Sequence, residues 1–95
     1  MNTKTTSFNK AGIGKLPNDK PVVYKIQSES GKTNYIGTAQ RGRVQERIAE
    51  HLRGAKDQVP GTKVHIQQKN SIADARKTEG IIISRMKPKY NKQGK

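Results

Sequence analysis

The chain contains no cysteine and no tryptophan, and aromatic residues make up only 4% of it. Without cysteine, neither a disulfide-stabilised secreted scaffold nor a thiolate metal site is possible. No apolar run exceeds about four residues, whereas a membrane-spanning helix needs about 20 and a signal peptide about 7 or more. We therefore expect an intracellular, cytoplasmic protein with no membrane partner.

Acidic residues are also scarce, because seven Asp and Glu face twenty Lys and Arg, for a formal net charge of +13. Such a surface attracts polyanions, so nucleic acid is the expected partner. Charge alone does not separate an enzyme from a binding module or a basic ribosome-associated protein. With 95 residues, of which 29% are hydrophobic, the chain has room for a single domain with a small core.

The first twenty residues carry scattered apolar residues without a period that would bury one face. We therefore divide the chain into a flexible basic arm at 1–20, a domain at 21–91 and a basic tail at 92–95. Within the arm, a Gly-Ile-Gly triplet is expected to form a flexible turn. It lacks the preceding strand and the following helix of a phosphate-binding loop.

Two β-rich runs follow, at 22–26 and 35–39, and the turn-forming stretch SESGKT lies between them. This arrangement predicts a β-hairpin. Val64 and Ile66 then alternate with polar neighbours over 63–69, which predicts a third strand with one buried face. The expected sheet is small, three-stranded and mainly antiparallel.

Two helices are predicted around this sheet. The apolar residues Val44, Ile48 and Leu52 recur every four positions, which indicates a helix over 43–53 that ends at Gly54.

The second helix is predicted from its capping pattern. Ser71 followed by Asp74 is a capping box that opens a helix, and the helix is expected to end at about Met86 because Pro88 forbids its continuation. The fold class is therefore a mixed α/β protein of the α+β kind, with helices flanking the sheet.

A carboxylate interrupts the apolar stripe of this second helix. At 100° per residue, Glu79 falls near the middle of the stripe, whose other members are Ile72, Ala75, Ile82, Ile83 and Met86. An ionised carboxylate on an apolar face is costly unless it is paired, hydrogen-bonded, metal-bound or at a wet cleft. Glu79 is thus either a residue at the stripe's edge paired with a cation or a metal ligand.

The first predicted helix places Arg47 and His51 four residues apart, beside its apolar stripe. Arginine grips phosphate with a rigid fork of donors, and histidine can carry a proton near neutral pH. The alternative for Arg47 is an ion pair with Glu46 or Glu50 on the helix surface. His65 is expected to be a surface residue of the third strand, and no His or Cys spacing fits zinc.

Taken in order, these residues resemble the GIY-YIG nuclease superfamily over roughly 22–91. The matching elements are Val22-Val23-Tyr24, Tyr35-Ile36-Gly37, Arg47 with His51, Glu79, and a Pro-x-Tyr-Asn ending that closes at Asn91. The first motif lacks its initial glycine. The stretch between the second motif and the first helix is slightly long, so Arg43 competes with Arg47 for the catalytic place.

The resemblance implies a GIY-YIG fold and hydrolysis of DNA phosphodiesters at a site with a single divalent cation, Mg²⁺ or Mn²⁺, in a bacterial or phage-like protein. Glu79 would hold the metal, Arg47 would hold the scissile phosphate, and Tyr24 would act as general base if nearby cations lower the pKa of its phenol. Tyr35 and His51 would orient water or phosphate, and Asn91 would lie near the metal.

DNA, including branched or otherwise structured DNA, is the implied partner. The basic residues expected to contact it are Arg43, Arg47, Lys25, Lys87 and Lys89. Two alternatives stay open: a non-catalytic DNA- or RNA-binding module on the same fold, and tyrosines that only pack the sheet.

Overall fold

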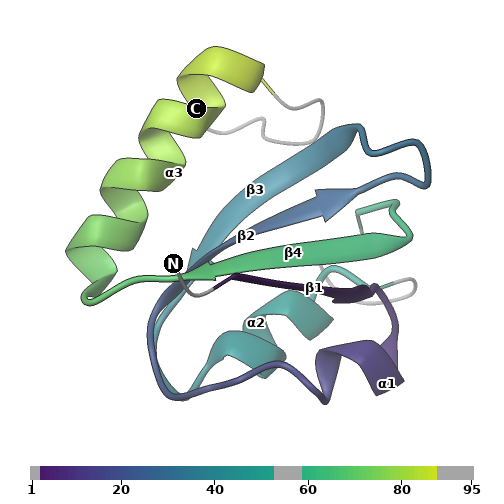
Figure 1. Ribbon diagram of the computed structural model, residues 1–95, viewed down its shortest axis with the longest axis horizontal. Helices are drawn as coiled ribbons and strands as arrows, with labels where there is room; N and C mark the ends of the chain where they lie inside the picture. The colour runs from purple at the N-terminus through teal and green to yellow at the C-terminus, as the bar shows by residue number, and fades with distance from the viewer. Residues whose placement is uncertain (1–2, 53–58, 88–95) are drawn as a thin grey trace.

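The computed structural model describes residues 3–52 and 59–87. Figure 1 shows its strands and helices in one compact arrangement. In chain order they are β1 (Thr3–Ser7), α1 (Lys10–Ile13), β2 (Val22–Gln27), β3 (Thr33–Ala39), α2 (Val44–Ala49), β4 (Lys63–Gln68) and α3 (Ile72–Met86).

The strands form one antiparallel sheet in the order β1-β4-β2-β3. The predicted hairpin is confirmed, since β2 pairs with β3, and the predicted third strand is β4, which pairs with the other side of β2. The sheet nevertheless has four described strands, because β1 adds to the outer edge of β4. The α+β class with flanking helices is confirmed.

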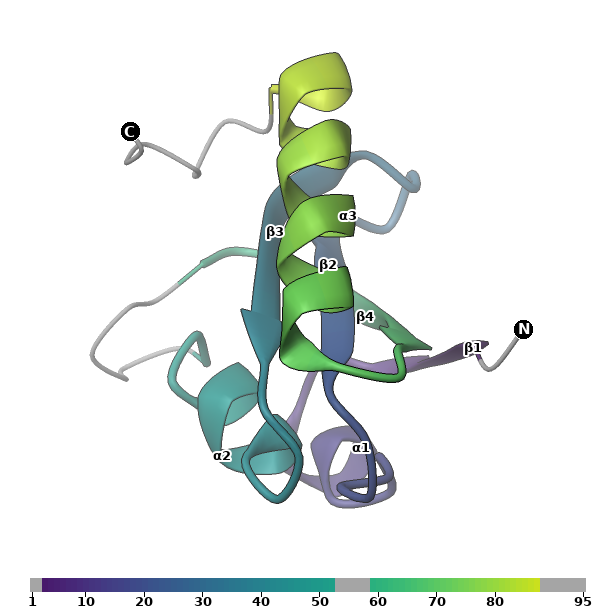
Figure 2. The same cartoon turned by 90° about the vertical axis from the view of Figure 1, so that its left-hand side faces the viewer.

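Helices cover the two faces of the sheet differently. Long α3 lies across β2 and β3 on one face, while short α1 and α2 lie on the other (Figures 1 and 2). Because successive strand residues point to opposite faces, Val23 packs with Ala75 of α3, whereas Tyr24 packs with Val44 and Ile48 of α2. The larger hydrophobic cluster is the one on the α1 and α2 face.

The N-terminal segment corrects the prediction of a flexible arm at 1–20. Its described part forms β1 and α1, and Ile13 and Leu16 are buried in the main core. Gly12 packs so tightly that a Cβ atom there would overlap the carbonyl of Ser7. Phe8, Ile13 and Leu16 stand at irregular spacing and show no period, yet all three pack in or against the main core.

The helices follow the predicted signals with two differences. The Ser71 side chain accepts a hydrogen bond from the backbone N–H of Asp74, as the capping box predicts, and α3 ends at Met86. However, Met86 is 49% exposed, so the apolar stripe ends before the last helical residue.

Helix α2 is shorter than the predicted 43–53, because it ends at Ala49 and a turn carries the chain to Leu52. The predicted stop at Gly54 and the proline after α3 lie outside the described residues. None of the helices within 3–52 and 59–87 is long and apolar enough to cross a membrane.

Candidate active site

A buried tyrosine–histidine pair lies between β2 and the turn after α2. Tyr24 and His51 are 0% and 1% exposed, and the Tyr24 Oη lies 2.8 Å from the His51 Nε2. The strand register places Gly37 opposite Tyr24. A Cβ atom at Gly37 would lie 2.5 Å from the Tyr24 Oη, so the missing side chain makes room for the phenol. This contact gives the glycine of the Tyr35-Ile36-Gly37 motif a structural reason.

A third ring completes this cluster. Tyr35 lies diagonally across β2 and β3 from Tyr24, on the same face of the sheet. The Tyr35 ring centroid is 6.1 Å from that of Tyr24 and 4.5 Å from that of His51. The two tyrosines and the histidine singled out in the sequence are therefore brought together.

The Tyr24 phenol is strongly biased toward its neutral form. Burial raises the pKa of Tyr24 well above its ordinary value, and Tyr35 raises it further, while Arg47 lowers it by less. Arg47 thus acts in the expected direction, but among the described residues its effect is outweighed by burial, and the pKa of Tyr24 is raised and not lowered. The neutral phenol can donate its proton to His51, since the 2.8 Å contact needs one of these two atoms as donor.

Arg47 lies on α2 at the rim of this cluster. Its Nη1 donates to the Glu50 Oε1 at 2.8 Å, so the ion-pair alternative is present. The Arg47 side chain is 44% exposed, and exposed pairs of this kind contribute only about 0.2–1 kcal/mol. Burial lowers the pKa of Arg47, but Tyr24 and Glu50 raise it more, and the guanidinium stays charged. Arg47 can thus exchange Glu50 for another anion at small cost.

Glu79 is partly buried on the sheet-facing side of α3. Burial raises the pKa of Glu79, and the opposing charges are first Arg76 and then Arg47. Within the described residues it forms no salt bridge and accepts no hydrogen bond from a side chain. The carboxylate is therefore desolvated without direct neutralisation, as a metal ligand would be.

The donor set around Glu79 limits the kind of metal it could hold. No group of three or more His, Cys, Asp or Glu gathers anywhere in the part of the chain that the structure describes. A cation at Glu79 would take one carboxylate from these residues and keep several waters. This fits Mg²⁺ or Mn²⁺ and not a zinc site.

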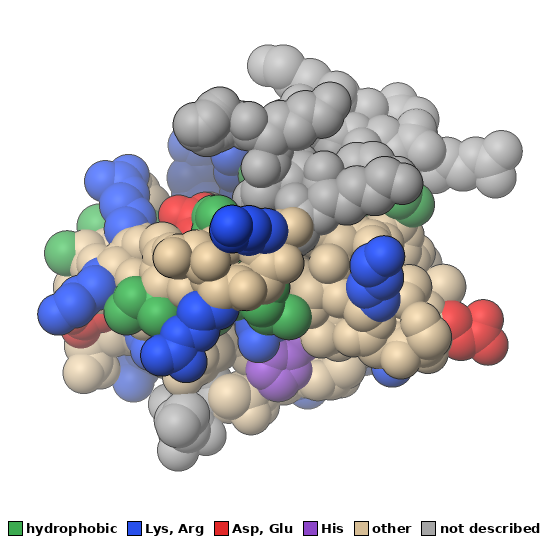
Figure 3. All heavy atoms as spheres, turned by 90° about the horizontal axis from the view of Figure 1, so that it is seen from above, with side chains coloured by type: hydrophobic (Ala, Val, Ile, Leu, Met, Phe, Trp, Pro, Cys, Tyr) green, Lys and Arg blue, Asp and Glu red, His purple; other side chains and the backbone are tan. Residues whose placement is uncertain are grey.

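A cleft of about 320 Å³ adjoins Arg47 between β3, α2 and α3. Its lining residues are Thr38, Ala39, Gln40, Arg43, Arg47, Ile72 and Arg76. Arg43 was predicted to contact nucleic acid, whereas Arg76 was missed. The signal was available, because Arg76 precedes Glu79 by three residues and therefore shares its face of the helix. Figure 3 views the molecule from the side that carries α3, and it shows Lys and Arg side chains spread over that side.

Comparisons with known proteins give matches only among solved structures. No protein-family model and no curated protein matches the chain. The GIY-YIG N-terminal endonuclease domain of UvrC from Thermotoga maritima, bound to its catalytic magnesium, matches with a TM-score of 0.61. The match covers 80% of this chain and 88% of that domain at 23% identity. The chain has the GIY-YIG endonuclease fold.

Two variants of the same Thermotoga maritima domain match similarly. One, with a tyrosine replaced by phenylalanine and its catalytic cation bound, has a TM-score of 0.62 at 21% identity, over 80% of this chain and 88% of that one. The other, with an asparagine replaced by alanine, has a TM-score of 0.60 at 22% identity, over 79% and 86%.

The remaining predicted residues lie apart from the site of this GIY-YIG fold or outside the described residues. Lys25 lies beside His65, where burial and then the Lys25 charge lower the pKa of the histidine. Lys87 caps α3 with a left-handed backbone, φ 46°. Neither Lys25 nor Lys87 lines the cleft of Arg43, Arg47 and Arg76, which we call the arginine cleft. Lys89 and Asn91 fall outside the described residues, so their roles stay predictions.

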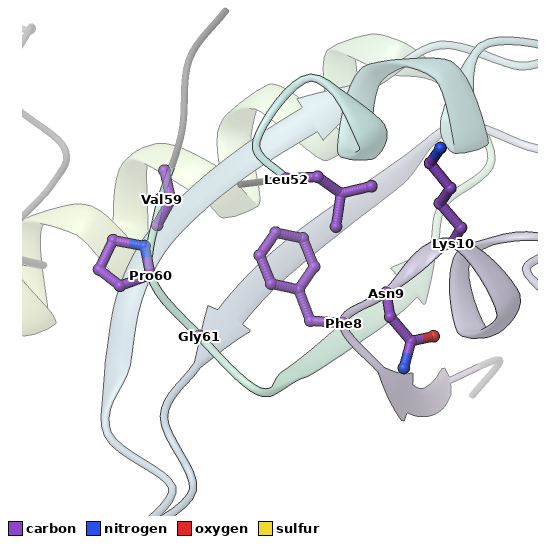
Figure 4. Close-up of a pocket in the computed structure, with 7 residues that line it drawn as sticks. All are labelled: Phe8, Asn9, Lys10, Leu52, Val59, Pro60 and Gly61. Carbon is purple, nitrogen blue, oxygen red and sulfur yellow. The ribbon is translucent and has the colours of Figure 1, made fainter. Parts of the chain in front are cut away.

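A larger hollow of about 680 Å³ lies on the opposite side of the GIY-YIG fold. Phe8, Leu52 and Val59 point into it from three segments, as Figure 4 shows. Lys10 is its one titratable lining residue among those described. This hollow therefore offers apolar surface and not catalytic groups.

Proposed function

We propose that this protein is an endonuclease that hydrolyses DNA phosphodiester bonds with the help of a single Mg²⁺ or Mn²⁺ ion. The observation that carries the proposal is the contact between Tyr24 of β2 and His51, with Arg47 on α2 and Glu79 on α3 near enough to affect the charge of Tyr24. Arg47 and Glu79 each act electrostatically on Tyr24, and Arg47 acts on Glu79. Tyr24, Arg47 and Glu79 thus influence one another electrostatically, and His51 joins them through its contact with Tyr24.

Glu79 is the proposed metal ligand. Its carboxylate is partly desolvated, which makes it costly without a cation and favourable with one. When bound, the cation would supply Lewis-acid stabilisation of the phosphate and the leaving oxygen. The fold similarity to an endonuclease domain bound to magnesium supports a divalent cation as the cofactor.

Arg47 is the proposed ligand of the scissile phosphate. It would leave Glu50 and donate two parallel hydrogen bonds to the phosphate oxygens. Because charge on those oxygens grows during attack, a fixed guanidinium would stabilise the transition state more than the ground state. Removing such a donor typically costs about 10²–10³ in rate.

Tyr24 and His51 are the proposed proton path. Tyr24 is 0% exposed, so the site would have to open to admit water. The attacking water would then give a proton to the Tyr24 oxygen while the Tyr24 proton passes to the His51 Nε2, 2.8 Å away. The resulting hydroxide would form the new bond to phosphorus as the bond to the leaving oxygen breaks. This path never requires free tyrosinate, which the raised pKa of Tyr24 disfavours. Tyr35, whose ring is tilted by 48° against that of His51 at 4.5 Å, would keep the histidine ring oriented.

Specificity is proposed to come from DNA structure and not from a long base sequence. A domain of this size offers little surface for reading base edges, whereas its charge of +13 suits backbone contacts. Branched, nicked or single-stranded DNA are accordingly the substrates to compare.

A non-catalytic nucleic-acid-binding module is the second candidate. Two observations favour it: Tyr24 is held neutral, and Arg47 is already paired with Glu50. Such a module would bind DNA equally well with and without EDTA and would cut no strand.

The deciding experiment incubates the protein with linear, nicked, branched and single-stranded DNA, in Mg²⁺, in Mn²⁺ and in EDTA. Parent, Glu79→Gln and Arg47→Ala are compared. We expect cleavage only by the parent and only with metal. Equal cleavage by all three proteins, or none by any, would reject the endonuclease proposal, and in the second case EDTA-insensitive binding would identify a binding module.

A further inference from the structure

The arginine cleft concentrates positive charge beyond what one scissile phosphate requires. Arg43, Arg47 and Arg76 line one hollow of about 320 Å³, where like charges repel one another. Glu46 pairs with Arg43 and Glu50 with Arg47. Arg76 forms no salt bridge with any residue that the structure describes. A bound anion would relieve this repulsion.

Arg76 is placed next to the proposed metal ligand. It precedes Glu79 by three helical residues, about 4.5 Å along the axis at 1.5 Å per residue. Arg76 lowers the pKa of Glu79 more than Arg47 does. An anion held by Arg76 would therefore lie beside the proposed metal ligand.

The lining of the cleft also includes residues that can donate hydrogen bonds. Thr38 of β3 carries a hydroxyl and Gln40 carries an amide, and both line the cleft together with Arg76. None of the lining residues is acidic. The cleft is thus polar and donor-rich, as a binding site for a phosphodiester should be.

We propose that Arg76, together with Arg43, forms a second phosphate subsite, which holds the phosphodiester next to the one that is cleaved. The position of this subsite beside the cleaved bond rests on the proposed nuclease function, because that function places the scissile phosphate at Arg47. By fixing the neighbouring phosphate, the subsite sets the register of the strand across Glu79 and Arg47. Arg76 is therefore a positioning residue for the substrate backbone.

A binding experiment in EDTA tests the subsite without any need for cleavage. The affinity for a short labelled DNA duplex is measured over a range of salt concentrations for the parent, Arg76→Gln and Arg85→Gln. Arg85 is the matched control, because it is an exposed arginine on the same helix outside the cleft. A plot of log affinity against log salt concentration has a negative slope. Each lost phosphate contact makes this slope less steep by about 0.9.

We expect Arg76→Gln to make this slope less steep by about 0.9. It should also weaken binding about tenfold at low salt, as the loss of a charge-assisted hydrogen bond implies. Arg85→Gln should change the slope by less than half as much. Arg76→Lys should restore the slope but only part of the affinity, because lysine lacks the fork. An Arg76→Gln slope equal to that of the parent or of the Arg85→Gln control would overturn the subsite.

A cleavage experiment then tests its position. The substrate that is cut best receives one uncharged methylphosphonate at the phosphate next to the mapped cut. We expect this change to lower kcat/KM about tenfold for the parent and less than twofold for Arg76→Gln, since the contact is already lost. Equal sensitivity of both proteins would refute the placement. A parent that cuts nothing would refute the nuclease function, while the slopes in EDTA would still decide whether the cleft binds a phosphate.

Discussion

Replacing Tyr24 by phenylalanine tests the buried pair at the centre of the site. The change removes one oxygen that lies 2.8 Å from the His51 Nε2, at a position where both residues are at most 1% exposed. Losing one partner of a buried hydrogen bond costs about 1–3 kcal/mol. For a domain of this size, each kcal/mol lowers Tm by about 4–8 °C. A central cost of about 2 kcal/mol therefore predicts a fall of about 8–16 °C.

A double-mutant cycle separates this structural cost from catalysis. Tyr24→Phe and His51→Leu are each expected to destabilise the fold, but the two together should cost at least about 1 kcal/mol less than their sum, because no polar group is then left facing an apolar one. Activity should be lost in all three variants. Thermal unfolding measures the stabilities and DNA cleavage the activities. Additive stabilities, or a Tyr24→Phe variant within about 1 °C of the parent, would refute the buried hydrogen bond.

Two further predictions concern the stability of single-residue variants. Gly37→Ala should cost about 1–3 kcal/mol in chemical denaturation, because its Cβ would lie 2.5 Å from the Tyr24 Oη; a neutral effect would show that the phenol lies elsewhere. Glu79→Gln should stabilise the fold by up to about 0.5 kcal/mol at pH 7. The raised pKa of Glu79 means that the parent gains stability below its ordinary value of 4.5 and loses it as pH rises through the raised value. The difference between the two proteins should therefore shrink in acid, and a difference that grows there would contradict the sign of the shift.

Much of the fold could be read from local patterns. The hairpin of β2 and β3, the strand β4 and the cap of α3 at Ser71 each carry a signal that neighbouring residues complete. The strand β1 carries none, because its burial pattern is almost entirely exposed and its stability comes from pairing with β4, some sixty residues away. A window that moves along the sequence cannot see such a partner.

The site shows the same division. The motif residues Tyr24, Tyr35 and Glu79 were found because their types and order are distinctive. The 2.8 Å hydrogen bond between Tyr24 and His51 was not predicted, because His51 lies past the end of α2, in a turn whose course depends on tertiary packing. Arg76 was missed for another reason: its spacing from Glu79 was visible in the sequence, but among twenty cations that spacing alone does not separate a cleft residue from solvated surface charge.

The role of Glu79 is tested most directly by relaxation of a supercoiled plasmid in Mg²⁺. The parent is compared with Glu79→Gln and with Glu29→Gln, a control that makes the same change at an exposed position in the turn between β2 and β3. We predict strand scission by the parent and by Glu29→Gln, its loss in EDTA, and none above background by Glu79→Gln. Scission by Glu79→Gln at the rate of the parent would contradict the account.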